Sequence, residues 1–233
     1  MPARYWEQVA EATLVWDLQV IHAFLAKLAD AEPDNAQVAV DWRHNHELGV
    51  TKVLVSTWDR HGLLAKIAAA LSAMRVSIIR ADAYTRADNV VLDVFEVCDL
   101  DHRSMLDPAR LQAVTFLIEG ALCQPPRFAS IWAAQSHKWR PSADQIVPRV
   151  RGDNRSSPDH TVLRVEASDR RGLLYDILQS LTDCELSVNQ AVVNTIDGVA
   201  LDVFYLVDLQ GRRIVNPARL RRICRKVSRA ILS

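Results

Sequence analysis

The sequence predicts an α+β fold built from two consecutive βαββαβ units, with antiparallel sheets and an N-terminal helix. One long segment occurs twice in register, so that Gly62 recurs as Gly172, 110 positions later. Within each copy the apolar residues alternate between a period of two and helical spacing, which marks strands and helices in turn. The second copy lacks one residue, and the gap falls in a predicted hairpin turn, where deletions are tolerated.

The duplication is clearest in two motifs. Residues 59–64, Asp-Arg-His-Gly-Leu-Leu, match residues 169–174, Asp-Arg-Arg-Gly-Leu-Leu. Leu92-Asp93-Val94-Phe95 matches Leu201-Asp202-Val203-Phe204, and Pro108-Ala109-Arg110-Leu111 matches Pro217-Ala218-Arg219-Leu220. Register kept over such a length indicates two copies of one fold.

Each element of the first copy has its own signal. Residues 52–58 alternate as a half-buried strand does, and residues 63–74 place apolar side chains at helical spacing. Asp107 and Pro108 are typical of a helix start, and Asn216 and Pro217 repeat that start in the second copy. The predicted elements of the first copy are strands at 52–58, 76–84 and 90–98 and helices at 63–74 and 107–123.

A βαββαβ unit needs a fourth strand. Residues 145–151 can supply it for the first copy, whereas the second copy reaches Ser233 directly after its last helix. A similar strand around Val40 precedes the first copy. We expect this leading strand to fill an edge position in one of the two sheets.

The organisation that follows divides the chain into five segments. Residues 6–28 have a stripe of leucine and isoleucine side chains, and 127–139 form a second predicted helix that carries Trp132 and Trp139. Both helices are expected to pack on the repeats. The alternative is that they dock against a missing domain or against a second subunit. The segments are an N-terminal helical segment (1–37), a leading strand and linker (38–50), repeat 1 (51–123), a linker helix and strand (124–159) and repeat 2 (160–233).

Composition narrows the class of protein. The formal net charge of the 233 residues is zero, which argues against global attraction to nucleic acid or to an anionic membrane. Charged residues interrupt residues 5–28, so neither an export signal nor a membrane span is expected there, and a soluble cytoplasmic protein is predicted. The four cysteines form no C-x-x-C pair and are expected to be reduced and mostly buried. His44 and His46 lack a third ligand at fixed spacing, so no metal and no cofactor are predicted.

The D-R-x-G-L-L turn followed by a V-L-D-V-F strand resembles ACT domains, which are ferredoxin-like modules that usually bind amino acids. Residues 51–123 and 160–233 carry the resemblance. The tandem arrangement is similar to the C-terminal region of the bacterial protein-PII uridylyltransferase/uridylyl-removing enzymes. The resemblance implies an amino-acid sensor in nitrogen regulation, with glutamine the favoured ligand, acting as a homodimer or on a catalytic partner protein.

The catalytic signatures that this resemblance would require are missing from the sequence. Asp99-Leu100-Asp101 has the spacing of paired metal-binding aspartates, but no Gly-Ser loop precedes it and the second copy reads Asp-Leu-Gln. The chain also has no His-Asp dipeptide. We therefore predict no catalytic residue and a regulatory module that is not an enzyme.

A ligand is expected at the two D-R-x-G loops. Glycine at a helix start lets a ligand approach the backbone, and the free N–H groups of the first turn favour a carboxylate. The loop aspartates can accept from an α-amino group or cap the helix. The resemblance implies that the start of the second strand faces this loop, which adds one serine from each repeat to the site. The second and third residues of each loop could gate the site or set its selectivity. The candidate ligand-binding residues are Asp59, Arg60, His61, Gly62, Leu63, Leu64, Ser77, Asp169, Arg170, Arg171, Gly172, Leu173, Leu174 and Ser187.

Two other functions are compatible with the sequence. The D-R-x-G turn could serve only to start a helix, in which case the protein is a scaffold for interaction or dimerisation. Residues 211–233 contain eight Arg or Lys and no acid, which could hold phosphates of a nucleic acid. No aromatic residues interleave these arginines, so a solvated helix face is the simpler interpretation.

Overall fold

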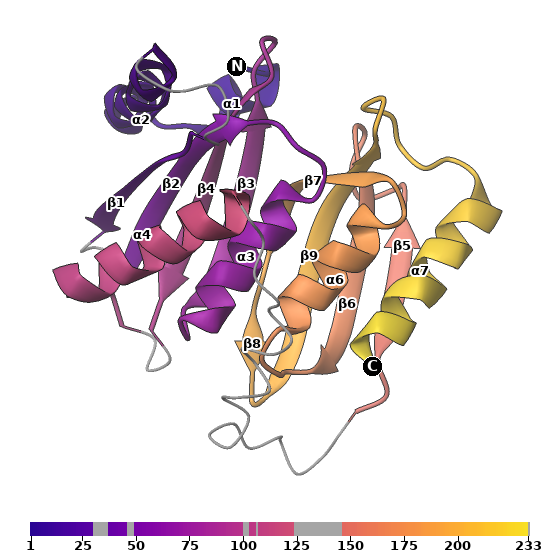
Figure 1. Cartoon of the computed structure of the whole chain (residues 1–233). Helices are drawn as coiled ribbons and strands as arrows, with labels where there is room; N and C mark the ends of the chain where they lie inside the picture. Colours follow the sequence, from indigo (N-terminus) through magenta and orange to yellow (C-terminus); the bar gives the residue numbers. More distant parts are fainter. Residues whose placement is uncertain (30–36, 46–48, 100–102, 106, 124–145, 233) are drawn as a thin grey trace.

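The computed structural model describes residues 1–29, 37–45, 49–99, 103–105, 107–123 and 146–232. They form an α+β fold in which helices and antiparallel strands alternate as predicted (Figure 1). The helices are α1 (Ala3–Gln8), α2 (Glu11–Ala29), α3 (Leu63–Ala73), α4 (Pro108–Cys123), α6 (Leu173–Thr182) and α7 (Pro217–Ile231). The strands are β1 (Ala39–Asn45), β2 (Val50–Trp58), β3 (Ser77–Thr85), β4 (Val90–Cys98), β5 (Arg149–Asp153), β6 (Thr161–Ser168), β7 (Leu186–Val192), β8 (Thr195–Ile196) and β9 (Val199–Asp208).

The strands of both repeats join in one continuous sheet. Its order is β1-β2-β4-β3-β7-β9-β6-β5, with the short β8 paired to β9, so the two sheets expected from the sequence meet edge to edge. Helices α3, α4, α6 and α7 cover one face, where they form the main apolar core with both repeats (Figure 1). Each repeat is therefore a two-layer α/β unit, and the layers run on across the boundary between repeats.

The fourth strand of each repeat precedes it. β1 pairs antiparallel with β2 at one edge of the sheet, which confirms the expected edge position of the leading strand. The expectation that residues 145–151 complete the first repeat is wrong, because β5 pairs antiparallel with β6 of the second repeat. Each repeat thus runs ββαββα, a permutation of βαββαβ that fills the same edge position from the other end of the unit.

The joint between the repeats lies at β3 and β7, which occupy equivalent places in the two copies. They pair antiparallel, with Ala81 opposite Ala191, the same position of the repeat. Beside them, Gln190 donates a hydrogen bond of 2.7 Å to the Asp82 carboxylate. The two buried alanines allow close approach on the core face, and the arrangement is a pseudo-twofold one.

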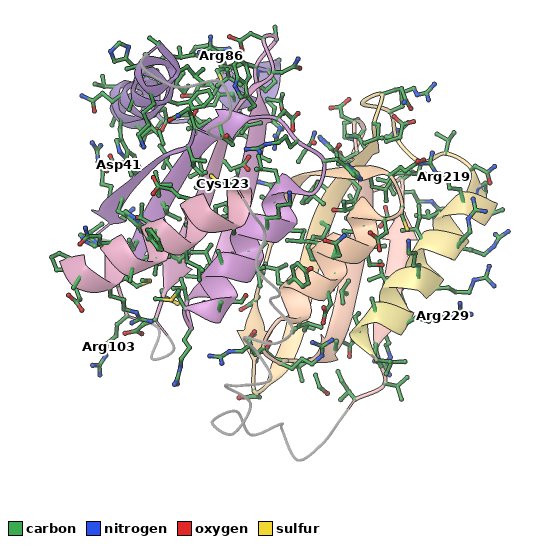
Figure 2. The ribbon with its side chains drawn as sticks, in the orientation of Figure 1. Asp41, Arg86, Arg103, Cys123, Arg219 and Arg229 are labelled. Atoms are coloured by element: carbon green, nitrogen blue, oxygen red, sulfur yellow. The ribbon has the colours of Figure 1, made fainter. Side chains whose placement is uncertain are left out.

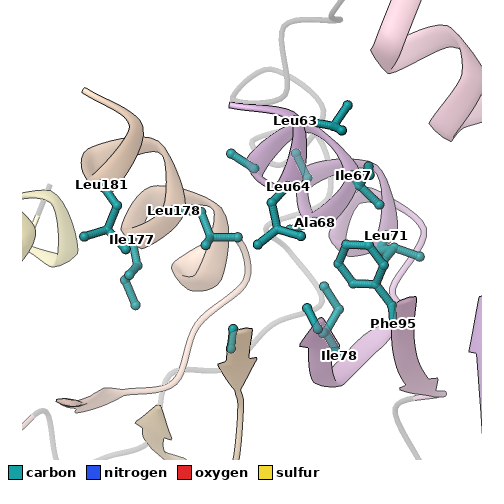
Figure 3. Close-up of a cluster of buried hydrophobic side chains, with 14 of the residues drawn as sticks. Leu63, Leu64, Ile67, Ala68, Leu71, Ile78, Phe95, Ile177, Leu178 and Leu181 are labelled. Carbon is teal, nitrogen blue, oxygen red and sulfur yellow. The ribbon is translucent and has the colours of Figure 1, made fainter. Parts of the chain in front are cut away.

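The first helices of the repeats pack against each other above this joint. Figure 3 shows Leu64 and Ala68 of α3 facing Leu178 of α6. These three side chains are at most 9% exposed and belong to one apolar cluster that includes residues of both sheet halves. Burial of this seam contributes to stability in proportion to its apolar area. The repeats therefore share one core.

The N-terminal segment differs from the single helix expected over residues 6–28, because α1 ends at Gln8 and α2 begins at Glu11. Of the expected stripe, Ile21 is buried but Leu18 and Leu25 are exposed, and the other buried apolar side chains of α2 are those of Trp16, Val20 and Phe24. As expected, the helices pack on a repeat: α2 and Tyr5 of α1 cover the second face of the sheet over repeat 1, in a core that includes Leu54, Tyr84, Val90 and Leu92. The helix α2 is long and apolar enough to cross a membrane, judged by length and composition alone. The core helix of a folded protein meets the same criteria.

Other expectations fall near the ends of the elements. Asp107 accepts from the Ala109 N–H and Asn216 from the Ala218 and Arg219 N–H groups, which confirms both predicted helix starts. The expectation that the cysteines are mostly buried is wrong, because Cys98 alone among the four is buried, Cys184 and Cys224 are half-buried and Cys123 is exposed. The helix predicted over 127–139 lies outside the described residues.

Arg4 of α1 connects the two repeats. The β3–β7 ladder ends at Asp82 and Gln190, and the Arg4 guanidinium donates to the carbonyls directly beyond it, those of Ala83 and Asn189. Its Cζ also lies 4.7 Å from the centre of the Tyr84 ring. A charged side chain thus replaces strand pairing on this side of the joint.

We predict that Arg4→Ala lowers the free energy of unfolding by about 1–3 kcal/mol, because two carbonyls lose a charged donor. Arg4→Lys should restore part of the loss, since an ammonium reaches fewer acceptors than a planar guanidinium. Glu7→Ala on the same helix should be nearly neutral. Urea unfolding of the four proteins measures the effect, and equal stability of wild type and Arg4→Ala would contradict it.

Candidate functional site in the cavities between the repeats

Two cavities lie at pseudo-equivalent positions on either side of the β3–β7 joint. The first has a volume of about 100 Å³ and the second about 180 Å³. The first cavity is lined by Asp59–Ala65, Ala83, Thr85, Val91, Asp93, Leu178, Thr182 and Leu186–Asn189. The second cavity is lined by Ser72, Arg75–Ile78, Asp169–Leu174, Val193 and Thr195.

Each cavity is built by both repeats. The first combines residues 59–64 with Ser187, and the second combines residues 169–174 with Ser77. All the ligand-binding residues predicted from the sequence therefore line one cavity or the other. The sequence does not show that each loop faces the second strand of the other repeat, which follows from the antiparallel joint.

The two glycines have the conformation that their position requires. Gly62 and Gly172 precede α3 and α6 with φ of 78° and 77°, in the left-handed region where a side chain is strained. The N-cap glycines supply no side-chain acceptor, and although the Leu63 and Leu173 N–H groups donate to the Arg60 and Arg170 carbonyls, the next N–H groups of the first turns have no capping side chain. The loops thus present helix N-termini to the cavities.

The guanidinium groups of the loop arginines bind groups of their own repeat. Arg60 donates to the Leu122 carbonyl at 3.2 Å, and Arg170 donates to the carbonyls of Ala230 and Ile231 at 3.3 Å. These carbonyls end α4 and α7, where a cation offsets the negative end of the helix dipole. Arg60 and Arg170 thus have a structural role that both repeats share, while they also line the two cavities and their part in ligand selection stays a prediction.

The third residue of each loop contacts the other repeat. His61 Nε2 lies 2.7 Å from the Thr182 carbonyl at the end of α6, so this nitrogen carries the proton. Arg171 lies with Ser72 and Arg75, at the end of α3, on the wall of the second cavity. Burial and the neighbouring Arg75 charge lower the pKa of Arg171. His61 is thus more than a solvated loop residue, while Arg171 adds positive charge to the second cavity.

The loop aspartates are held by threonines of the adjacent hairpin. Thr85 donates to Asp59 at 3.3 Å, and Thr195, at the equivalent position, bonds the Asp169 carboxylate. Burial raises the pKa of Asp169, against the opposing effect of these hydrogen bonds and of Arg170. Both loops therefore hold a carboxylate at the mouth of a helix N-terminus.

A second carboxylate in each repeat was not singled out from the sequence. Asp93 and Asp202, in the matched Leu-Asp-Val-Phe strands, are each 2% exposed. Burial, reinforced by Asp59, raises the pKa of Asp93 to about 8, and burial with Asp169 raises the pKa of Asp202 to about 7. The sequence signal that could have identified these residues is an aspartate inside an apolar strand in both copies. Such a residue stands out because a buried charge needs a partner.

The sequence is similar to proteins of one family. Residues 149–233 match a family model described as ACR9-like, ACT-like domain. The bifunctional uridylyltransferase/uridylyl-removing enzyme of Gluconobacter oxydans is 35% identical over 210 residues, covering 89% of this chain and 22% of the enzyme. That of Azospirillum brasilense is 29% identical over 230 residues, covering 97% and 24%, and that of Rhodospirillum rubrum is 32% identical over 205 residues, covering 83% and 21%.

The class follows from three findings: residues 149–233 match an ACT-like domain, the first repeat duplicates this sequence, and both repeats share one fold, so the chain is similar to a tandem ACT-like protein. It is related to the C-terminal regulatory region of the bifunctional uridylyltransferase/uridylyl-removing enzymes. The chain spans between a fifth and a quarter of the length of these relatives. Among solved structures, aspartate kinase from Synechocystis aligns with 70% of this chain and 25% of its own at a TM-score of 0.36 and 19% identity, a likeness too slight to bear on the fold.

We predict that Gly62→Ala destabilises the protein by about 1 kcal/mol or more, because the residue has a positive φ. The added Cβ would also lie 3.1 Å from Thr182 Cγ2. Gly49→Ala is the matched control, since Gly49 has φ of 63° but nothing within 4 Å of an added Cβ. Thermal unfolding should rank Gly62→Ala below Gly49→Ala, and the reverse order would count against this packing.

The buried strand aspartates predict a pH dependence of stability. Their folded pKa values of about 8 and 7 lie above the ordinary value of 3.8, so the native state retains protons that the unfolded state releases. The contribution of these two groups to the free energy of unfolding should therefore be largest at and below pH 4, fall as pH rises towards 8 and then level off. Asp93→Asn should reduce this decline, whereas Asp88→Asn, at an exposed turn, should leave it in place. A decline that Asp93→Asn leaves unchanged in denaturant unfolding at several pH values would refute the assignment.

Proposed function

We propose that this chain is a non-catalytic regulatory module that senses an amino acid, bound in the second cavity between the Asp169 loop and the start of β3. The observation that carries the proposal is that this cavity joins opposite charges within one small space. Asp169 supplies a carboxylate, while Arg75, Arg171 and the open N-terminus of α6 supply positive charge. An amino acid carries the complementary pair.

The recognition would divide the ligand into three parts. The α-amino group suits the Asp169 carboxylate, and the α-carboxylate suits the helix N–H groups together with Arg171. The side chain would meet Val76, Ile78 and Val193, which form the apolar part of the wall. Glutamine is the first ligand to test, because the resemblance points to nitrogen regulation.

Binding in the second cavity would depend on how the two repeats are arranged. The cavity exists only where the loop of repeat 2 faces the strand of repeat 1, so a ligand would favour the joined arrangement over any opened one. A ligand can shift such an equilibrium by its differential affinity for the two states. A regulatory output would follow if a partner or an adjoining enzyme distinguishes these states, and cytoplasmic action is part of the proposal.

Thermal unfolding with each of the twenty amino acids at millimolar concentration tests the proposal. A ligand that binds the folded state alone stabilises it by about 2.7 kcal/mol at a hundredfold excess over Kd. We expect one or two amino acids, glutamine first, to raise the melting temperature of the wild type and to lose this effect on Asp169→Asn.

Asp59→Asn is the matched control, since it makes the same change in the equivalent loop and should keep the response. No shift with any amino acid would favour the scaffold interpretation. A response lost on Asp59→Asn but kept on Asp169→Asn would move the site to the first cavity.

A further inference from the structure

The first cavity differs from the second in having a buried strand aspartate in its lining. Asp93 is 2% exposed and lines the first cavity, and its carboxyl group has no hydrogen-bond partner among the described residues. The equivalent Asp202 does not line the second cavity and accepts a hydrogen bond of 3.3 Å from the Asn194 N–H. The Asp93 oxygens are not among the fully enclosed unsatisfied atoms of the described residues, so a group bound in the cavity can reach this carboxyl. A carboxyl with so little exposure is costly to ionise unless such a group pairs with it.

The difference between the two aspartates comes from the strand beside each of them. In repeat 2, β7 ends at Val192 and β8 begins at Thr195, which leaves the Asn194 N–H free to turn towards Asp202. In repeat 1, β3 continues to Thr85, and Tyr84 stays in register opposite Leu92. The uninterrupted strand therefore offers Asp93 no backbone donor.

The charged groups around Asp93 are committed elsewhere. Asp59 faces it from the loop before α3 and adds a second negative charge. Of the cations near the cavity, Arg4 binds the carbonyls of Ala83 and Asn189, Arg60 binds the Leu122 carbonyl and His61 binds the Thr182 carbonyl. No cationic side chain among the described residues therefore bonds Asp93, whose charged neighbour in the cavity is Asp59.

We propose that the first cavity is a binding site for a small primary ammonium group, held by Asp93 and Asp59. A primary ammonium has three donors, and the Asp93 carboxylate, the Asp59 carboxylate and the Ser187 hydroxyl on the facing strand are acceptors lining one space. The cavity of about 100 Å³ has room for a compact group of this kind. Ca²⁺ and Mg²⁺ take six or more oxygen ligands, and no cluster of three or more His, Cys, Asp or Glu suited to a metal ion exists among the described residues.

This site goes beyond the proposed amino-acid sensing and uses different residues. The two pseudo-equivalent cavities would then have diverged, so that the second takes a zwitterion and the first takes a cation alone. Because burial raises the pKa of Asp93 to about 8, a bound ammonium displaces the carboxyl proton to solvent at neutral pH. Affinity should therefore rise about tenfold between pH 7 and pH 9, as the ionised fraction of the carboxyl rises from about a tenth to nine tenths.

The probe is methylammonium chloride, compared with tetramethylammonium chloride at equal ionic strength, because the second cation has no N–H donors. We expect the wild type at pH 8 to melt at a higher temperature in methylammonium than in tetramethylammonium. The difference should vanish in Asp93→Asn and persist in Asp202→Asn, the same change at the equivalent position of the other repeat.

Titration of the amide NMR spectrum with methylammonium gives the affinity and its pH dependence, and the ligand-free spectrum shows that each variant is folded. The absence of any methylammonium effect on the wild type would overturn the proposal. So would an unchanged effect in Asp93→Asn. Loss of the methylammonium effect with a preserved amino-acid response would separate this site from the second cavity, whereas a negative amino-acid panel with a positive methylammonium titration would refute the sensor and keep the ammonium site.

Discussion

The antiparallel pairing of β3 with β7 is the constraint on which the rest of the structure depends. It places the same strand of each repeat side by side and sets Ala81 against Ala191. From this joint follow the continuous sheet, the packing of α3 on α6 and the facing of each loop with the strand of the other repeat. A different edge pairing would keep both folds and abolish both cavities.

The D-R-x-G motif has separable parts once the structure is considered. Glycine allows the turn into the helix, and arginine binds the carbonyls that end the second helix of its own repeat. Aspartate remains at the cavity, while the residue between Arg and Gly reaches the other repeat. Half of the motif therefore holds the fold together and half lines a cavity, which explains why the motif alone does not establish binding.

Duplication also explains how the copies could diverge. α1 and α2 cover the second face of the sheet over repeat 1, and Arg4 binds one side of the joint between the repeats. Repeat 2 carries the basic helix α7, whose labelled residues Arg219 and Arg229 project away from the sheet in Figure 2. Other cations of this region bind within the protein, since Lys226 contacts the Asp183 carbonyl and Arg213 the carbonyls of Asn154 and Ser157. The basic run is thus partly a structural feature.

The sequence by itself determined the duplication, the type of nearly every described element and the loops that line the cavities, because periodicity, capping residues and turn chemistry are local signals. It did not determine that β5 belongs to repeat 2, since a strand flanked by two units has the same local pattern whichever edge it joins. Nor did it identify Arg60 as a helix-end ligand or Asp93 as a buried group without a partner. Those roles depend on residues distant in the chain, and only the tertiary structure, through the β3–β7 joint and the packing around it, brings them together.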